Sequence, residues 1–171
     1  MTDVVRRAVV IVASTSAAEG TAQDATGPVL VRWLADRLWT VTGPVVVADG
    51  EPVAAALRAA ITDGVDLVIT TGGTGLSPDD ATPEATRAVI DREVPGIAEE
   101  LRRRGAEHTP LAWLSRGVAG VAGRTLIVNL PGSSGGVRDG LEVLDEVLEH
   151  AVAVIGGTAR HGQRPASDSN E

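Results

Sequence analysis

Residues 65–86 read VDLVITTGGTGLSPDDATPEAT, an apolar run that passes through a glycine-rich, acidic loop into the start of a helix. The run VDLVITTGG (65–73) has consecutive aliphatic and β-branched residues, which is typical of a strand buried on both faces. We expect a helix over 82–94, in which Thr82 caps the first turn and Pro83 occupies the first helical position. A buried strand that leads directly into a helix is the repeating unit of a parallel α/β sheet.

The same unit recurs on both sides of this stretch. Apolar runs predict further strands, and apolar residues three and four positions apart predict further helices. We expect strands at 8–15, 43–50, 65–73 and 125–131, the last after a turn around Gly123, and helices at 26–39, 51–64, 82–94, 96–105 and 136–155. This alternation predicts a three-layer α/β/α fold with a mostly parallel, Rossmann-like sheet.

The chain of 171 residues is long enough to bury a sizeable core, and we expect one domain over residues 1–157. The sequence shows no internal repeat and no linker that would divide it. Residues 158–171 lose all periodicity and are rich in polar residues, so we expect a disordered tail there.

Composition excludes several classes of function. A formal net charge of -8 opposes binding to nucleic acid and to anionic membranes. The chain has no cysteine and no lysine, which excludes disulfides, thiolate metal sites, Schiff bases and a Walker-type phosphate loop. The apolar run near the N-terminus is too short to span a membrane, so we expect a cytoplasmic protein.

Polar residues gather where the predicted strands end. Ser14 to Ser16, Asp49, GGTG (72–75) and NLPGSSGG (129–136) each follow a strand. In a parallel sheet the carboxyl ends of the strands meet at one edge, where ligands bind. The histidines His108, His150 and His161 have no metal-ligand spacing, and the arginines at 102–104 suit a helix C-terminus. We therefore interpret both groups as structural or surface residues.

Each polar strand end has two interpretations. The GGTG loop either offers backbone N–H groups to an anion or simply makes a tight turn that needs positive φ angles. Asp80, next to Asp79, either holds Mg²⁺ beside substrate phosphates or is a solvated acid before a helix. Asp49 either supplies the second metal-binding carboxylate or caps the next helix. Ser133 and Ser134 can cap the last helix or receive a phosphate.

The order and spacing of five segments resemble the molybdopterin adenylyltransferases of molybdenum cofactor biosynthesis, the Mog/MoaB family, which is related to the gephyrin G domain. These segments are TTGGTG (70–75), DDATPEAT (79–86), VPGIAEELR (94–102), LSRGVAGV (114–121) and LIVNLPGSSGGVRDGL (126–141). The resemblance covers roughly residues 6–157. It implies a molybdopterin-binding α/β fold that is usually a homotrimer.

The resemblance also implies a reaction and a set of site residues. Molybdopterin and Mg-ATP would give adenylylated molybdopterin and pyrophosphate, and the product would pass to a molybdenum-insertion protein. Asp49 and Asp80 match the family carboxylates for metal binding and catalysis. The positions that match substrate- and nucleotide-binding residues are Ser14, Asp24, Gly72, Gly73, Thr74, Gly75, Asn129, Pro131, Gly132 and Ser133.

Three positions depart from the family pattern. Many relatives have an arginine where this chain has Ser16, and a Pro-Lys pair where it has Ser134 and Gly135. The loss of two cations weakens electrostatic attraction for anionic substrates. A non-catalytic molybdopterin-binding or carrier protein is therefore the alternative function.

Overall fold

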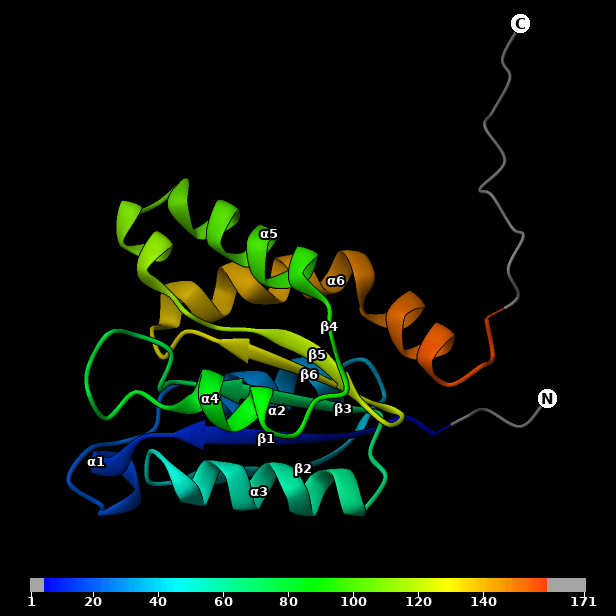
Figure 1. Ribbon diagram of the computed structural model, residues 1–171, viewed down its shortest axis with the longest axis horizontal. Helices are drawn as coiled ribbons and strands as arrows, with labels where there is room; N and C mark the ends of the chain where they lie inside the picture. The colour runs from blue at the N-terminus through cyan, green and yellow to red at the C-terminus, as the bar shows by residue number, and fades with distance from the viewer. Residues whose placement is uncertain (1–4, 160–171) are drawn as a thin grey trace, which may run out of the picture.

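The structure, a computed structural model, describes residues 5–159 and contains one six-stranded sheet flanked by helices (Figure 1). The strands are β1 (Arg7–Ala13), β2 (Thr40–Val47), β3 (Leu67–Thr71), β4 (Arg92–Glu93), β5 (Ala119–Ala122) and β6 (Thr125–Leu130). The helices are α1 (Thr15–Ala18), α2 (Gly27–Ala35), α3 (Glu51–Thr62), α4 (Thr82–Arg87), α5 (Pro95–Ala106) and α6 (Ser134–Ile155), with a 3-10 helix η1 (Pro110–Leu114).

The strand order is β2-β1-β3-β6-β5-β4. The first four strands are parallel, and β5 and β4 continue the sheet in antiparallel pairing. Val10, Ile69 and Val128 lie side by side on β1, β3 and β6, and all three are fully buried. The predicted three-layer fold with a mostly parallel sheet is confirmed.

Each face of the sheet carries its own apolar core. Leu30 of α2, Ile97 of α5 and Leu144 of α6 belong to the cluster on one face. Val53 and Leu57 of α3 belong to the cluster on the other face, against which α4 also packs. Figure 1 shows α5 and α6 above the sheet and α3 below it. Burial on both faces explains why the central strands are continuous apolar runs.

The predicted helix over 82–94 is wrong in its extent, because α4 ends at Arg87. The backbone N–H groups of Asp91 and Val94 instead donate to carbonyls of β5, at Val121 and Ala119, both at 2.8 Å. The following residues are therefore drawn into the sheet as β4. The predicted cap is also wrong, because Thr82 lies inside the helix and Ala81 occupies the capping position.

Other boundaries also differ from the predicted ones. Strand β2 begins at Thr40 and ends at Val47, so Asp49 lies two residues beyond it. The apolar stretch before Gly123 forms β5, which pairs with β6 as an antiparallel hairpin. Residues 160–171 of the predicted tail, including His161, lie outside the described residues. No helix within residues 5–159 is both long enough and apolar enough to cross a bilayer.

Replacing Leu144 with alanine should lower the free energy of unfolding by about 2–5 kcal/mol, because the lost side chain leaves a cavity between α6 and the sheet. Val147, on the same helix, is 38% exposed. Val147→Ala should change the free energy of unfolding by no more than about 0.5 kcal/mol. Urea denaturation of both variants measures the difference. Equal effects would show that α6 does not bury the face assigned to it.

Candidate functional site

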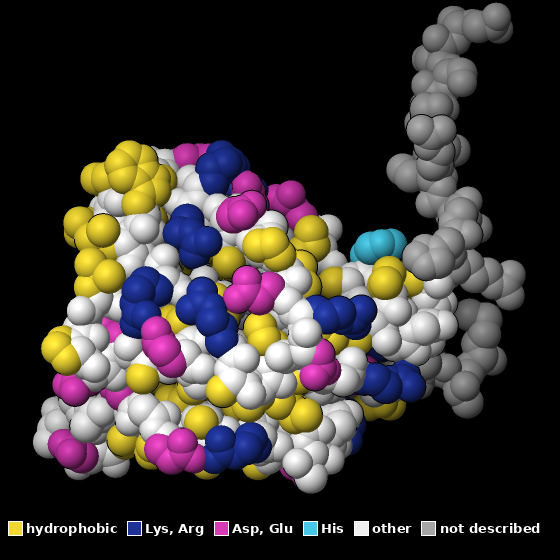
Figure 2. All heavy atoms as spheres, in the orientation of Figure 1, with side chains coloured by type: hydrophobic (Ala, Val, Ile, Leu, Met, Phe, Trp, Pro, Cys, Tyr) yellow, Lys and Arg dark blue, Asp and Glu magenta, His cyan; other side chains and the backbone are white. Residues whose placement is uncertain are grey.

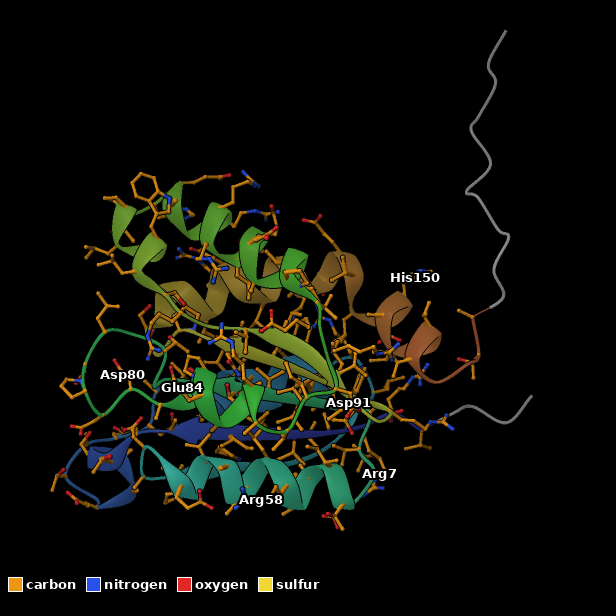
Figure 3. All side chains as sticks on the ribbon, viewed as in Figure 1. Arg7, Arg58, Asp80, Glu84, Asp91 and His150 are labelled. Atoms are coloured by element: carbon orange, nitrogen blue, oxygen red, sulfur yellow. The ribbon has the colours of Figure 1, made fainter. Side chains whose placement is uncertain are left out.

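A cavity of about 640 Å³ lies at the carboxyl ends of β3 and β6. Its lower wall is formed by the loop after β3, residues 72–75 with Asp80, and by the loop from Asn129 into α6. Helix α5 and η1 form the opposite wall. Figure 3 shows Asp80 and Glu84 at this end of the sheet, whereas His150 lies at the other end. The cavity thus occupies the edge where the sequence predicts ligand binding.

The two predicted glycine loops touch each other. The Gly72 N–H donates to the Leu130 carbonyl at 3.1 Å, and a Cβ built on Gly132 would lie 3.2 Å from the Gly72 Cα. Gly72 and Gly73 have φ angles of 91° and 65°, and a Cβ on Gly72 would overlap the Ala13 carbonyl oxygen. The tight-turn interpretation therefore holds, and the same turn lines the cavity.

Asp49 lies behind this loop rather than in the cavity wall. Its Oδ2 accepts hydrogen bonds from the Thr15 backbone N–H and hydroxyl at 3.2 and 3.0 Å. Within residues 5–159, neither its Oδ1 nor the Thr82 Oγ1 has a hydrogen-bond partner, although both atoms are buried. Both lie against Gly73, where a Cβ would meet them. Two buried oxygens without a donor fit a hard cation such as Mg²⁺.

Asp80 borders the cavity on the other side of the same loop. Its Oδ2 accepts from the Ser77 N–H at 3.0 Å and lies 2.7 Å from where a Cβ on Gly75 would be. Asp79 is exposed. The structure thus brings both predicted carboxylates against one loop, at Gly73 and Gly75. In the described part of the chain, no three His, Cys, Asp or Glu residues gather into a metal site, so a cation there needs further oxygens from a substrate.

Arg116 holds this loop in place. Its Nε donates to the Gly75 carbonyl at 2.8 Å, its Nη2 donates to the Asp80 carbonyl at 2.7 Å, and its Nη1 pairs with Glu84. The hydrogen bond from Arg116 holds the pKa of Glu84 below its usual value. Arg116 lies in the segment LSRGVAGV (114–121), and no role was predicted for it from the sequence. A single arginine in an otherwise apolar segment was the available signal.

Asn129 joins four elements beneath the cavity and is almost fully buried. Its Nδ2 donates to the hydroxyls of Thr70 and Thr86, both at 3.0 Å, and its Oδ1 accepts from the Val118 N–H at 3.1 Å. Both amide hydrogens are therefore used inside the protein. The side chain can therefore contact a ligand through the remaining lone pair of Oδ1.

The N-terminus of α6 opens into the cavity beside Pro131 and Gly132. Ser133 caps the helix, because its Oγ accepts from the Gly136 N–H at 3.1 Å. The 22-residue helix directs the positive end of its dipole, and free backbone N–H groups of its first turn, toward the cavity. The capping interpretation is confirmed for Ser133, and this end of the cavity suits an anion.

Ser14 and Asp24 do not line this cavity. Ser14 caps α1 by accepting from the Ala17 N–H at 3.2 Å. Asp24 Oδ1 accepts from the N–H groups of Thr26 and Gly27, both at 3.0 Å, and so holds the start of α2. These contacts are structural, whereas Asp24 Oδ2 is buried without a hydrogen-bond partner within residues 5–159. The assignment of both residues to binding stays a prediction.

Four residues of the cavity wall were not predicted as site residues. His108 Nδ1 lies 3.2 Å from Asp139 Oδ2, and the Arg138 guanidinium lies 3.3 Å from Asp139 Oδ1. Arg102 donates to the carbonyls of Ser115 and Gly117. His108 and Arg102 were interpreted as structural or surface residues, and their contacts agree with this, but α5 and η1 also bring both of them to the cavity wall. No local pattern in the sequence signals this.

Lysine at position 116 would keep the positive charge but replace the forked guanidinium with one ammonium, which cannot serve both loop carbonyls and Glu84. In Arg116→Lys, amide hydrogen exchange at residues 74–80 should be about tenfold faster than in the wild type. Arg87→Lys is the matched control, because Arg87 forms an exposed ion pair with Glu93 on the surface. Unchanged exchange in Arg116→Lys would show that the loop holds its shape without this residue.

Comparison with known proteins places the chain in a family. Residues 9–150 match the family described as "Probable molybdopterin binding domain". A molybdenum cofactor biosynthesis bifunctional protein from Synechococcus elongatus is 42% identical over 157 residues, covering 91% of this chain and 49% of that protein. The chain thus spans about half the length of this curated relative. A molybdopterin adenylyltransferase from Haemophilus influenzae is 38% identical over 136 residues, covering 75% of this chain and 68% of that protein.

Solved structures agree with the sequence relatives. The molybdopterin biosynthesis Mog protein from Mycobacterium ulcerans is 52% identical, with a TM-score of 0.84 over 91% of this chain and 99% of that one. The family match over residues 9–150 includes every residue that lines the cavity. The chain therefore belongs to the molybdopterin-binding domain family, among the Mog and MoaB proteins of molybdenum cofactor biosynthesis.

Proposed function

We propose that this chain is a molybdopterin adenylyltransferase that transfers AMP from Mg-ATP to the terminal phosphate of molybdopterin and releases pyrophosphate. The observation that carries the proposal is the pair of buried, unpartnered oxygens, Asp49 Oδ1 and Thr82 Oγ1, beside the glycine loop. The name of the relative from Haemophilus influenzae supports the same activity.

The reaction needs no nucleophile from the protein. An oxygen of the molybdopterin phosphate forms a bond to the α-phosphorus of ATP, and the bond from that phosphorus to the oxygen bridging to the β-phosphate breaks. The substrate phosphate is already ionised near pH 7, so the protein has to align the reactants and neutralise charge. A chain without lysine or cysteine can meet both requirements.

Residues at the cavity and behind its glycine loop have different roles in this reaction. Asp49 and Asp80 would hold Mg²⁺ together with phosphate oxygens, and the ion would withdraw negative charge from the reacting phosphates. Gly72 and Gly73 let the backbone approach those phosphates closely. The α6 N-terminus supplies N–H donors for an anion. These groups supply local positive potential in a chain whose net charge is -8.

Arginines in the cavity wall compensate for the departures from the family pattern. The positions of Ser134 and Gly135 carry no lysine, but Arg102 and Arg138 line the same cavity. The alternative function, molybdopterin binding without turnover, is supported by the absence of the family cations at Ser16 and Gly135. It predicts tight binding of molybdopterin with no pyrophosphate release in the presence of Mg-ATP.

Asp49→Asn and Asp80→Asn should each lower the rate of pyrophosphate release from Mg-ATP and molybdopterin by at least about 100-fold, since an amide is a poor ligand for a hard cation. Asp79→Asn is the matched control, because Asp79 is exposed beside Asp80, and it should react like the wild type. An Asp80→Asn variant that releases pyrophosphate at the wild-type rate would contradict the assignment. A wild type that binds molybdopterin but releases none would support the alternative.

We further propose a cytoplasmic homotrimer that passes its product to a molybdenum-insertion protein. Exposed apolar side chains support an assembly. Leu76, Leu111, Trp113 and Leu114 are each at least half exposed. Figure 2 shows hydrophobic side chains gathered over η1. Surfaces of this kind are typical of contacts between proteins.

Light scattering of the purified full chain should give three times the mass of one chain, because the exposed apolar side chains would be covered in a trimer. The measured mass should stay the same when the protein is diluted tenfold. The mass of a single chain at all concentrations would contradict the trimer and leave the activity assignment untouched.

A further inference from the structure

The two ends of the cavity differ in chemistry. One end has the glycine loops, Asp80 and the α6 N-terminus, which suit phosphates. The other end has apolar side chains from α5 and η1, among them Leu101, Ala112 and Leu114. Gly105 keeps these two elements close, since a Cβ there would lie 2.8 Å from the Ala112 Cβ. Apolar walls of this kind suit a planar ring.

A buried carboxylate, Asp139, lies at this apolar end. It is the sixth residue of α6, its side chain is only 6% exposed, and it borders the cavity. His108 and Arg138 each contact one of its two oxygens. A carboxylate has about four positions that accept hydrogen bonds, so acceptor capacity remains for a ligand.

We infer that Asp139 is the residue that recognises the pterin ring, by accepting hydrogen bonds from its 2-amino group and N3–H. These two donors lie side by side and match the two oxygens of a carboxylate, as the donors of a guanidinium do. Adenine instead presents a donor beside an acceptor, N1, which would face a carboxylate oxygen and repel it. Asp139 therefore selects pterin over adenine at this end.

This assignment rests on the proposed function and adds an orientation to it. The pterin ring lies between α5, η1 and Asp139, and its phosphate points toward the α6 N-terminus and the glycine loop. His108 and Arg138 are positioning residues, since each contacts one oxygen of the carboxylate and so holds its orientation. The nucleotide then approaches from the side of Asp49 and Asp80.

The test compares two probes, 6-hydroxymethylpterin phosphate and the corresponding lumazine phosphate, in which an oxygen replaces the 2-amino group. Isothermal titration of the wild-type protein should show at least tenfold tighter binding of the pterin, because a site built to bond an N–H rejects the analogue that lacks it. Asp139→Asn should lose this preference, since its amide can donate to the lumazine oxygen. Its affinity for Mg-ATP should stay within twofold.

Two control variants separate recognition from structure. Glu142→Gln removes an exposed carboxylate on the same helix and should keep the pterin preference. His108→Gln should weaken pterin binding but keep the preference, because the carboxylate remains. Asp139→Asn with an unchanged preference would overturn the inference, as would a wild type that binds neither probe. Either result is independent of pyrophosphate release, which tests the proposed reaction.

Discussion

The close approach of three backbone segments at Gly72 is the constraint on which the site depends. Its N–H donates to the Leu130 carbonyl, its Cα faces Gly132, and the Ala13 carbonyl occupies the space where a side chain would be. A residue with a Cβ cannot occupy this position without moving β1 or β6. The carboxyl ends of β1, β3 and β6 are therefore held together, and the two loops that form the lower wall of the cavity start from this contact.

Buried polar side chains extend this constraint outward. Asn129 of β6 bonds to β3, to α4 and to Val118 just before β5, and Arg116 bonds to the loop that follows β3. These bonds lie in a region shielded from water, where an unpaired donor or acceptor is costly. Within residues 5–159, three buried side-chain oxygens lack a hydrogen-bond partner: Asp24 Oδ2, Asp49 Oδ1 and Thr82 Oγ1. The last two lie together against Gly73.

The distribution of charge explains how an acidic chain can bind anionic substrates. Two of the four arginines of α5 and α6, Arg103 and Arg104, are paired with glutamates such as Glu100, and that pairing holds the pKa of Glu100 below its usual value. Arg102 and Arg138 instead reach the cavity. Backbone N–H groups add positive potential that no count of charged residues reveals.

The sequence by itself determined the layers, the parallel strands and the loops at their ends, because apolar runs, helical periodicity and glycine positions depend on neighbours along the chain. It did not determine β4, the end of α4 or the direction of β5, since those follow from backbone pairing with distant segments. Asp49 and Asp80 were predicted from sequence as site residues, whereas Arg116, His108 and Asp139 were not. Arg116 reaches the loop after β3, and His108 reaches Asp139, across 30 or more residues of sequence, so only the tertiary packing makes these contacts.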